Sequence, residues 1–149
     1  MTIMKRLLLF MLILVFSHSC QYETDWKECR LMDSNSIEFS FEAGIGEIKV
    51  RPEINNDVRL YGLIGIDGEL VRTGWAECSY NKESQIQSMV FQTAPWLTIK
   101  GFSETGREDV LNDFVLEVDS NPGGTLRTCR LVFVATDKKQ TVTVTQHAE

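Results

Sequence analysis

Apolar and polar residues alternate one for one along much of this chain, and this alternation constrains the fold more than any other feature. Residues 37–42 read Ile-Glu-Phe-Ser-Phe-Glu, and residues 141–145 read Thr-Val-Thr-Val-Thr. A period of two puts alternate side chains on opposite faces of a strand, so each segment predicts a strand with one buried face. No twelve-residue window after residue 19 shows a clean period of 3.6. The chain is therefore predicted to be all-β.

Turn-forming residues divide the alternating pattern into short segments. We expect turns at residues 43–46, at Asp67-Gly68 and at Asn121-Pro-Gly-Gly124, and the second of these favours a two-residue type I′ hairpin. About eight to ten short strands result. A domain of such strands at residues 35–147 is typical of a β-sandwich.

The first nineteen residues have the pattern of an export signal. Lys5 and Arg6 precede ten apolar residues at positions 7–16, which as a helix would cover about 15 Å, roughly half of a hydrocarbon core. That length is typical of a signal peptide at residues 1–19 rather than of a membrane span. The predicted product is exported and starts at Cys20, and polar residues 20–34 are predicted to form a tether.

The residues around Cys20 resemble a bacterial lipobox, in which the cysteine receives a lipid. Ser17 departs from that pattern, because an aliphatic residue usually stands three positions before the cysteine; Ser17 and Ser19 also fit ordinary small-x-small cleavage. The resemblance implies a lipoprotein held in a membrane by acyl chains on Cys20. We expect it in the outer membrane or at the cell surface.

The charge balance makes nucleic acid a poor candidate partner. The chain has 15 basic and 21 acidic residues, and removing residues 1–19 leaves 13 basic residues and a net charge of −8. Such a chain repels phosphate backbones, and no basic stripe interrupts the acidic surface pattern.

Four cysteines leave the thiol chemistry open. If Cys20 carries lipid, three remain, so at least one is unpaired or pairs between molecules. Cys78 and Cys129 lie on apolar strand faces and are the candidate disulfide, with two reduced buried thiols as the alternative. No Cys-x-x-Cys or Cys-x-x-His spacing indicates zinc.

The carboxy-terminal half resembles the BACON domain (Bacteroidetes-associated carbohydrate-binding, often N-terminal). The resemblance implies an immunoglobulin-like sandwich that binds carbohydrate or acts as a spacer. Residues 37–50 would supply the opening strands, whereas the segment 51–95 is longer than the family pattern and is predicted to hold an inserted hairpin at about 55–90. The motifs, in order, are Trp96-Leu-Thr-Ile99, residues 114–120, Asn121-Pro-Gly-Gly124, residues 127–134 and residues 141–146.

Residues for catalysis are scarce. After the predicted leader the chain has one histidine, His147, and it has no Gly-x-Ser-x-Gly or phosphate-binding glycine motif. Four acidic residues in the charged segment 103–113 could gather around calcium, but their spacing matches no known loop and a solvated loop is favoured. They are Glu104, Glu108, Asp109 and Asp113. We therefore expect no enzyme activity, cofactor or metal.

Exposed aromatic rings are the remaining candidates for recognition, because the C–H faces of sugars pack on them. Trp75 and Tyr80 are the predicted glycan contacts, whereas Trp96 is expected in the core and Trp26 in the tether. The sequence thus favours a non-catalytic surface lipoprotein that acts as a binding or adaptor module, possible partners being a glycan or a surface protein. Direct carbohydrate binding and assembly through a sheet edge are the two more specific alternatives.

Overall fold

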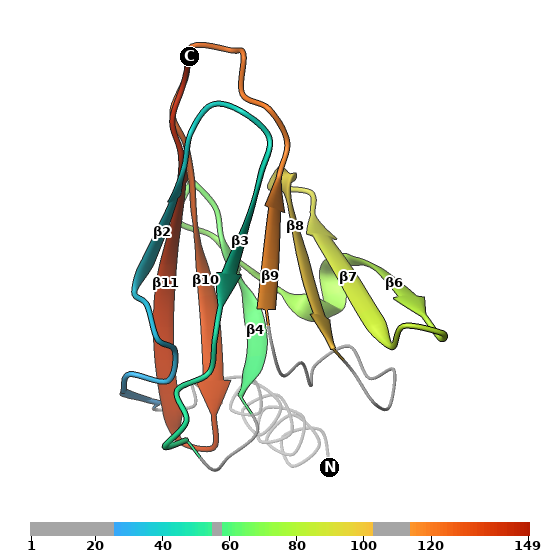
Figure 1. The fold of residues 1–149 in the computed structure, drawn as a ribbon. Helices are drawn as coiled ribbons and strands as arrows, with labels where there is room; N and C mark the ends of the chain where they lie inside the picture. Colours follow the sequence, from blue (N-terminus) through green and yellow to red (C-terminus); the bar gives the residue numbers. More distant parts are fainter. Residues whose placement is uncertain (1–25, 55–57, 103–113) are drawn as a thin grey trace, which may run out of the picture.

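The protein is an all-β sandwich, as predicted. The computed structural model describes residues 26–54, 58–102 and 114–149. These residues form eleven strands in two facing sheets (Figure 1) and one short 3-10 turn, η1 (Thr73–Trp75). The strands are β1 (Lys27–Glu28), β2 (Ser36–Phe39), β3 (Gly44–Ile48), β4 (Arg59–Ile64), β5 (Leu70–Arg72), β6 (Glu77–Asn81), β7 (Ile86–Phe91), β8 (Ala94–Phe102), β9 (Phe114–Val118), β10 (Arg127–Ala135) and β11 (Lys138–Gln146).

The first sheet has the order β1-β11-β10-β4-β5, and β2 also pairs with β11. β1 and β2 both run parallel to β11, β1 beside its start and β2 beside its end. Val142 and Val144 of β11 are fully buried and the threonines that alternate with them are half-buried, so the period of two correctly predicted which face of this strand packs inward.

The second sheet has the order β3-β9-β8-β7-β6, and its neighbours are antiparallel. Met89, Ile99 and Leu116 stand side by side on three adjacent strands and are fully buried. The rings of Phe114 and Phe133 meet across the two sheets edge to face, with centroids 4.8 Å apart. Such a pair contributes about 0.5–1.5 kcal/mol beyond the area that it buries.

Residues 27–34 belong to the domain and do not form the predicted tether. Leu31 and Met32 are fully buried, and they cross from β11 of the first sheet to the end of β3 in the second. Met32 forms a bridge with Val50, and Arg51 donates its backbone N–H to Leu31 O at 2.9 Å. The sequence did not indicate these two core residues, because the segment is polar overall and two adjacent apolar residues produce no alternating pattern.

The buried side chain of Gln140 holds this crossing in place. Its Oε1 accepts hydrogen bonds from the backbone N–H groups of Leu31 and Met32, both at 2.6 Å. Its Nε2 donates to Ser34 O at 3.0 Å and to Asn35 Oδ1 at 2.7 Å. The amide therefore satisfies backbone groups that leave the sheet between β1 and β2.

Two more buried amides hold the connections at the opposite end, where the β2–β3 and β9–β10 loops lie beside the carboxy terminus (Figure 1). Gln146 Nε2 donates to Asp119 O at 2.6 Å and to Glu42 O at 3.3 Å. Asn121 Nδ2 donates to Thr125 O at 2.8 Å and to His147 O at 3.1 Å. Both residues belong to motifs quoted above for the family resemblance, and here they bind the protein's own backbone.

The predicted turn at residues 43–46 is instead largely strand β3. Its glycines face the core, where the side chains of β2 leave no room for a Cβ. A Cβ on Gly46 would overlap Ile37 Cδ1 and come within 2.9 Å of Phe39 Cζ. These glycines therefore serve close packing rather than a reversal of the chain.

The segment 51–95 is not a separate inserted hairpin. Its strands β4 and β5 pair with each other in the first sheet, and β6 and β7 pair in the second. Leu60 and Leu63 of β4 are part of the core. The β4–β5 hairpin does turn at Asp67-Gly68, but only Gly68 has a positive φ (81°), and Gly68 N–H bonds Gly65 O at 3.1 Å. That pattern fits a three-residue loop with a bulge rather than type I′.

The predicted leader, Cys20 and the charged segment 103–113 lie outside the described residues. Within the ranges that the structure does describe, no helix is long and apolar enough to cross a bilayer.

Candidate binding site

A bulge in β4 turns Tyr61 onto the outer face of the first sheet. Val132 of β10 pairs with Gly62 and the next residue, Phe133, pairs with Leu60, so Tyr61 is an extra residue on β4. Bulges commonly re-aim a side chain in this way. Leu60 and Leu63 on either side stay buried in the core, while the Tyr61 ring lines a hollow outside the sheet.

Two neighbours fix the Tyr61 ring from different directions. Trp26, just before β1, meets it edge to face with ring centroids 4.6 Å apart and an interplanar angle of 81°. Arg72 of β5 places its Cζ 4.9 Å from the centroid of the tyrosine ring, a cation–π contact. The result is a row of two rings and a guanidinium.

Gly62 allows β5 to approach closely enough for that contact. Gly62 pairs with Arg72, and a Cβ on Gly62 would overlap Val71 O and come within 3.1 Å of Arg72 Cα. Any larger residue would therefore push β5 away from β4. Such close backbone approach is a common reason for glycine inside a strand.

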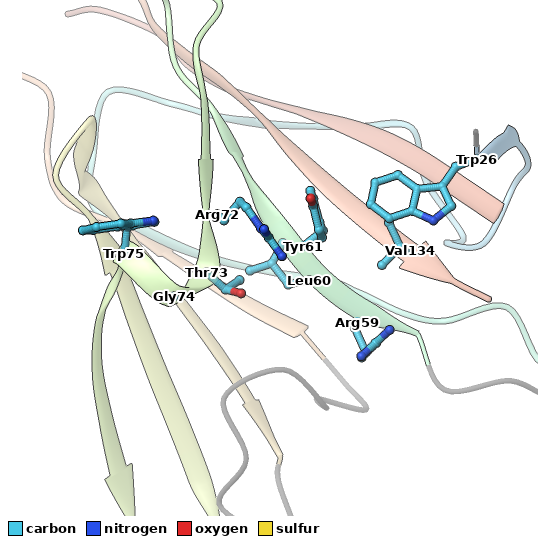
Figure 2. Close-up of a pocket in the computed structure, with 9 residues that line it drawn as sticks. All are labelled: Trp26, Arg59, Leu60, Tyr61, Arg72, Thr73, Gly74, Trp75 and Val134. Atoms are coloured by element: carbon cyan, nitrogen blue, oxygen red, sulfur yellow. The ribbon is translucent and has the colours of Figure 1, made fainter. Parts of the chain in front are cut away.

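These side chains surround an open hollow of about 500 Å³, within the usual range of about 300–1,000 Å³ for ligand sites. Figure 2 shows Trp75 and Trp26 at opposite ends, with Arg72 and Tyr61 between them. Trp75 follows β5 in the turn η1 and is 81% exposed. The lining residues are Trp26, Arg59, Leu60, Tyr61, Arg72, Thr73, Gly74, Trp75 and Val134.

The hollow offers flat apolar rings and positive charge together. Of the described residues that line it, none is acidic, and two are arginines. Rings of this kind stack on C–H faces or cations, and guanidinium groups donate hydrogen bonds in a fixed planar pattern. The arrangement suits a ligand that presents both an apolar face and oxygen acceptors.

The two predicted glycan contacts do not share this hollow. Trp75 lines it, but Tyr80 lies on β6 in the second sheet, opposite Gln87 in register, and is 36% exposed. Trp96 packs partly buried against the core, with Arg127 Cζ 6.0 Å from its ring centroid. Trp26, placed in the tether from sequence, lines the hollow instead.

Tyr61 and Arg72 gave no signal in the sequence. Both lie in segments that read as ordinary strands, and their meeting depends on the β4 bulge and on Gly62. The one cue was Gly62, one of two glycines inside the stretch 58–66, because a glycine within a strand often marks a bulge or a close approach.

None of the three cysteines in the described ranges, Cys29, Cys78 and Cys129, forms a disulfide in this structure. The Cys78–Cys129 disulfide is not formed, and it stays a prediction. Cys78 Sγ lies 3.6 Å from Ala76 O, and burial raises the pKa of the Cys129 thiol from 9.0 to about 12. Across the described part of the chain, no three His, Cys, Asp or Glu side chains are grouped to hold a metal ion. The four candidate calcium residues lie outside that part.

Comparison with known proteins supports the family resemblance for the carboxy-terminal part of the chain. Residues 81–147, a little under half of the chain, match the BACON family, described as "Putative binding domain, N-terminal". No curated protein matches the chain. An NMR structure of a protein from Bacteroides thetaiotaomicron is similar over 83% of this chain and 86% of its own, with a TM-score of 0.49 and 12% identity.

The match and the hollow occupy different parts of the domain. Val134 is the one residue of the hollow, among those described, that falls inside residues 81–147, so the rings and arginines come from the amino-terminal part. The matched region supplies the supporting strands, from the end of β6 to β11. Residues 81–147 are thus similar to the BACON family.

Proposed function

We propose that this protein is a non-catalytic binding module and that the hollow on the first sheet is its ligand site. The observation that carries the proposal is the row of Trp26, Tyr61 and Arg72 that ends at the exposed Trp75. Exposing a tryptophan side chain to water is unfavourable, so its 81% exposure beside a hollow favours a role in contact with a ligand.

The proposed ligand is a glycan. Sugar rings carry apolar C–H faces and many hydroxyl oxygens, and the hollow supplies aromatic faces next to guanidinium donors. The family resemblance points in the same direction. Tyr80 lies outside this site. The proposed site therefore replaces the sequence-based prediction that Trp75 and Tyr80 contact the glycan together.

The proposed setting is the outer membrane or cell surface, with the chain anchored through lipid on Cys20. Trp26 lies six positions after Cys20, and six residues span at most about 20 Å. The domain would therefore sit close to the membrane. A domain so close to the membrane is better placed to retain a ligand at the cell surface than to bind ligands far from the surface.

Affinity electrophoresis through gels that contain a panel of polysaccharides tests the proposal. We expect Trp75→Ala to be retarded less, with a dissociation constant at least tenfold higher. Loss of a stacked ring at a binding hot spot costs about 2 kcal/mol or more. Tyr80→Ala is the matched control, because it removes a similar exposed ring outside the hollow. Unchanged retardation of Trp75→Ala would reject the hollow as the site.

A second function, assembly through a sheet edge, is favoured by one observation. β6 ends the second sheet, pairs with β7 alone among the described strands, and exposes four of its five residues. Open edges of this kind can accept a strand from a partner. Light scattering over a hundredfold range of concentration tests the self-association form, and a monomer throughout would count against it.

A further inference from the structure

We infer that the hollow selects acidic glycans and that Arg72 binds their carboxylate groups. This inference rests on the proposed function and adds the chemical class of the ligand. Its basis is the contrast between the hollow and the rest of the chain. The chain carries a net charge of −6, yet the described residues that line the hollow include two arginines and no acid.

Arg72 is available to a ligand. It is exposed, and it forms no ion pair with any residue in the described ranges. Its one described contact is with the face of Tyr61, and this contact uses the flat side of the guanidinium group. The N–H groups at the edge remain free to donate two parallel hydrogen bonds to a carboxylate, the geometry for which arginine is best suited.

The backbone holds Arg72 and Trp75 at a fixed spacing. Arg72 is the residue before η1, and the turn is closed by a hydrogen bond from Ala76 N–H to Thr73 O at 3.1 Å. Figure 2 shows the Arg72 side chain between Trp75 and Tyr61. A sugar ring stacked on Trp75 would thus have its charged substituent next to the guanidinium.

A lipid surface is the other partner that aromatic and basic side chains suit, and the shape argues against it. Trp26 meets Tyr61 edge to face and is only partly exposed, so it cannot insert its ring into a bilayer without leaving that contact. The site is also concave, with a volume of about 500 Å³. A discrete ligand fits a concave site better than a flat membrane does.

The experiment compares acidic polymers with their neutral derivatives. Polygalacturonate, alginate and hyaluronan are each tested beside the methyl-esterified form, with the whole protein and three variants. We expect at least one acid polymer to bind tenfold more tightly than its ester, and this preference to disappear in Arg72→Gln. Arg72→Lys keeps the charge and should keep part of the preference. Arg130→Gln is the matched control on the outer side of β10, outside the hollow, and should bind like the unaltered protein.

The remaining outcomes each decide the matter. Equal binding of acid and ester forms that depends on Trp75 overturns the acidic selectivity and leaves the proposed function standing. Failure of every acid and neutral polymer to bind overturns both. An equal loss in Arg72→Gln and Arg130→Gln indicates general attraction to the surface and overturns the role of Arg72. Arg72-dependent binding to phosphatidylglycerol vesicles without any response to the polymers assigns the hollow to the membrane and also overturns the inference.

Discussion

Replacing Gln140 by methionine should destabilise the domain more than any change to an exposed residue. Methionine has a similar length and shape, so packing is largely kept while four hydrogen bonds are lost. The N–H groups of Leu31 and Met32 would lose their acceptor at a fully buried position. A buried donor without a partner costs about 1–3 kcal/mol, so the pair costs about 2–6 kcal/mol.

That loss is large compared with the total stability of a small domain, about 5–15 kcal/mol. It corresponds to a fall in melting temperature of about 8–20 °C for a domain of this size. Urea denaturation gives the loss in the free energy of unfolding, and the slope m shows whether both proteins unfold in one step. Hydrogen exchange supplies a local measure, because the amides of Leu31 and Met32 should exchange much faster in the variant.

Thr141→Val is the control for this prediction. It changes the next residue of β11, which points to the other side of the strand, and it should alter stability by about 0.5 kcal/mol or less. A loss below about 1 kcal/mol in Gln140→Met, or one no larger than that of Thr141→Val, would refute the argument. The crossing between the sheets would then be held by the apolar side chains alone.

Four further predictions concern other residues. Cys129 should react with iodoacetamide more slowly than the other two described cysteines. Because its folded pKa of about 12 exceeds the ordinary 9.0, the protonated thiol contributes its full stability below pH 9, and this contribution is lost as the pH rises through 12. The urea midpoint should therefore fall less over this pH range in Cys129→Ala than in the unaltered protein. Gln87 Oε1 is buried and accepts no hydrogen bond from the residues that the structure describes, so Gln87→Met should raise the urea midpoint by the equivalent of about 1 kcal/mol or more. Gly46→Ala should lower stability by about 1–3 kcal/mol in the same assay, since its Cβ would press on Phe39. Mass spectrometry of the exported protein should find acyl chains on Cys20 as the first residue, and a free Cys20 amine and thiol would contradict the anchor.

The strands and their inward faces follow from the sequence because side-chain alternation is a local property. Val142 and Val144 point inward whatever lies opposite them, since a strand has only two faces. The same logic failed at residues 31–32, where two adjacent core residues break the alternation. It failed at Gly44 and Gly46 too, because glycine in a strand and glycine in a turn look alike until the neighbour that needs the space is known.

The candidate site depended on the tertiary structure almost entirely. Trp75 stood out in the sequence as an aromatic residue without a core partner, and it does line the hollow. Its companions Trp26, Tyr61 and Arg72 are spread over 47 positions of the chain, and they meet only because β1, β4 and β5 are brought into one sheet by β10 and β11. The sequence by itself determined the strands and their inward faces, because both depend on near neighbours; the export signal stays a prediction. The bulge at Tyr61, the crossing held by Gln140 and the hollow were decided by the register between distant strands, which local patterns do not encode.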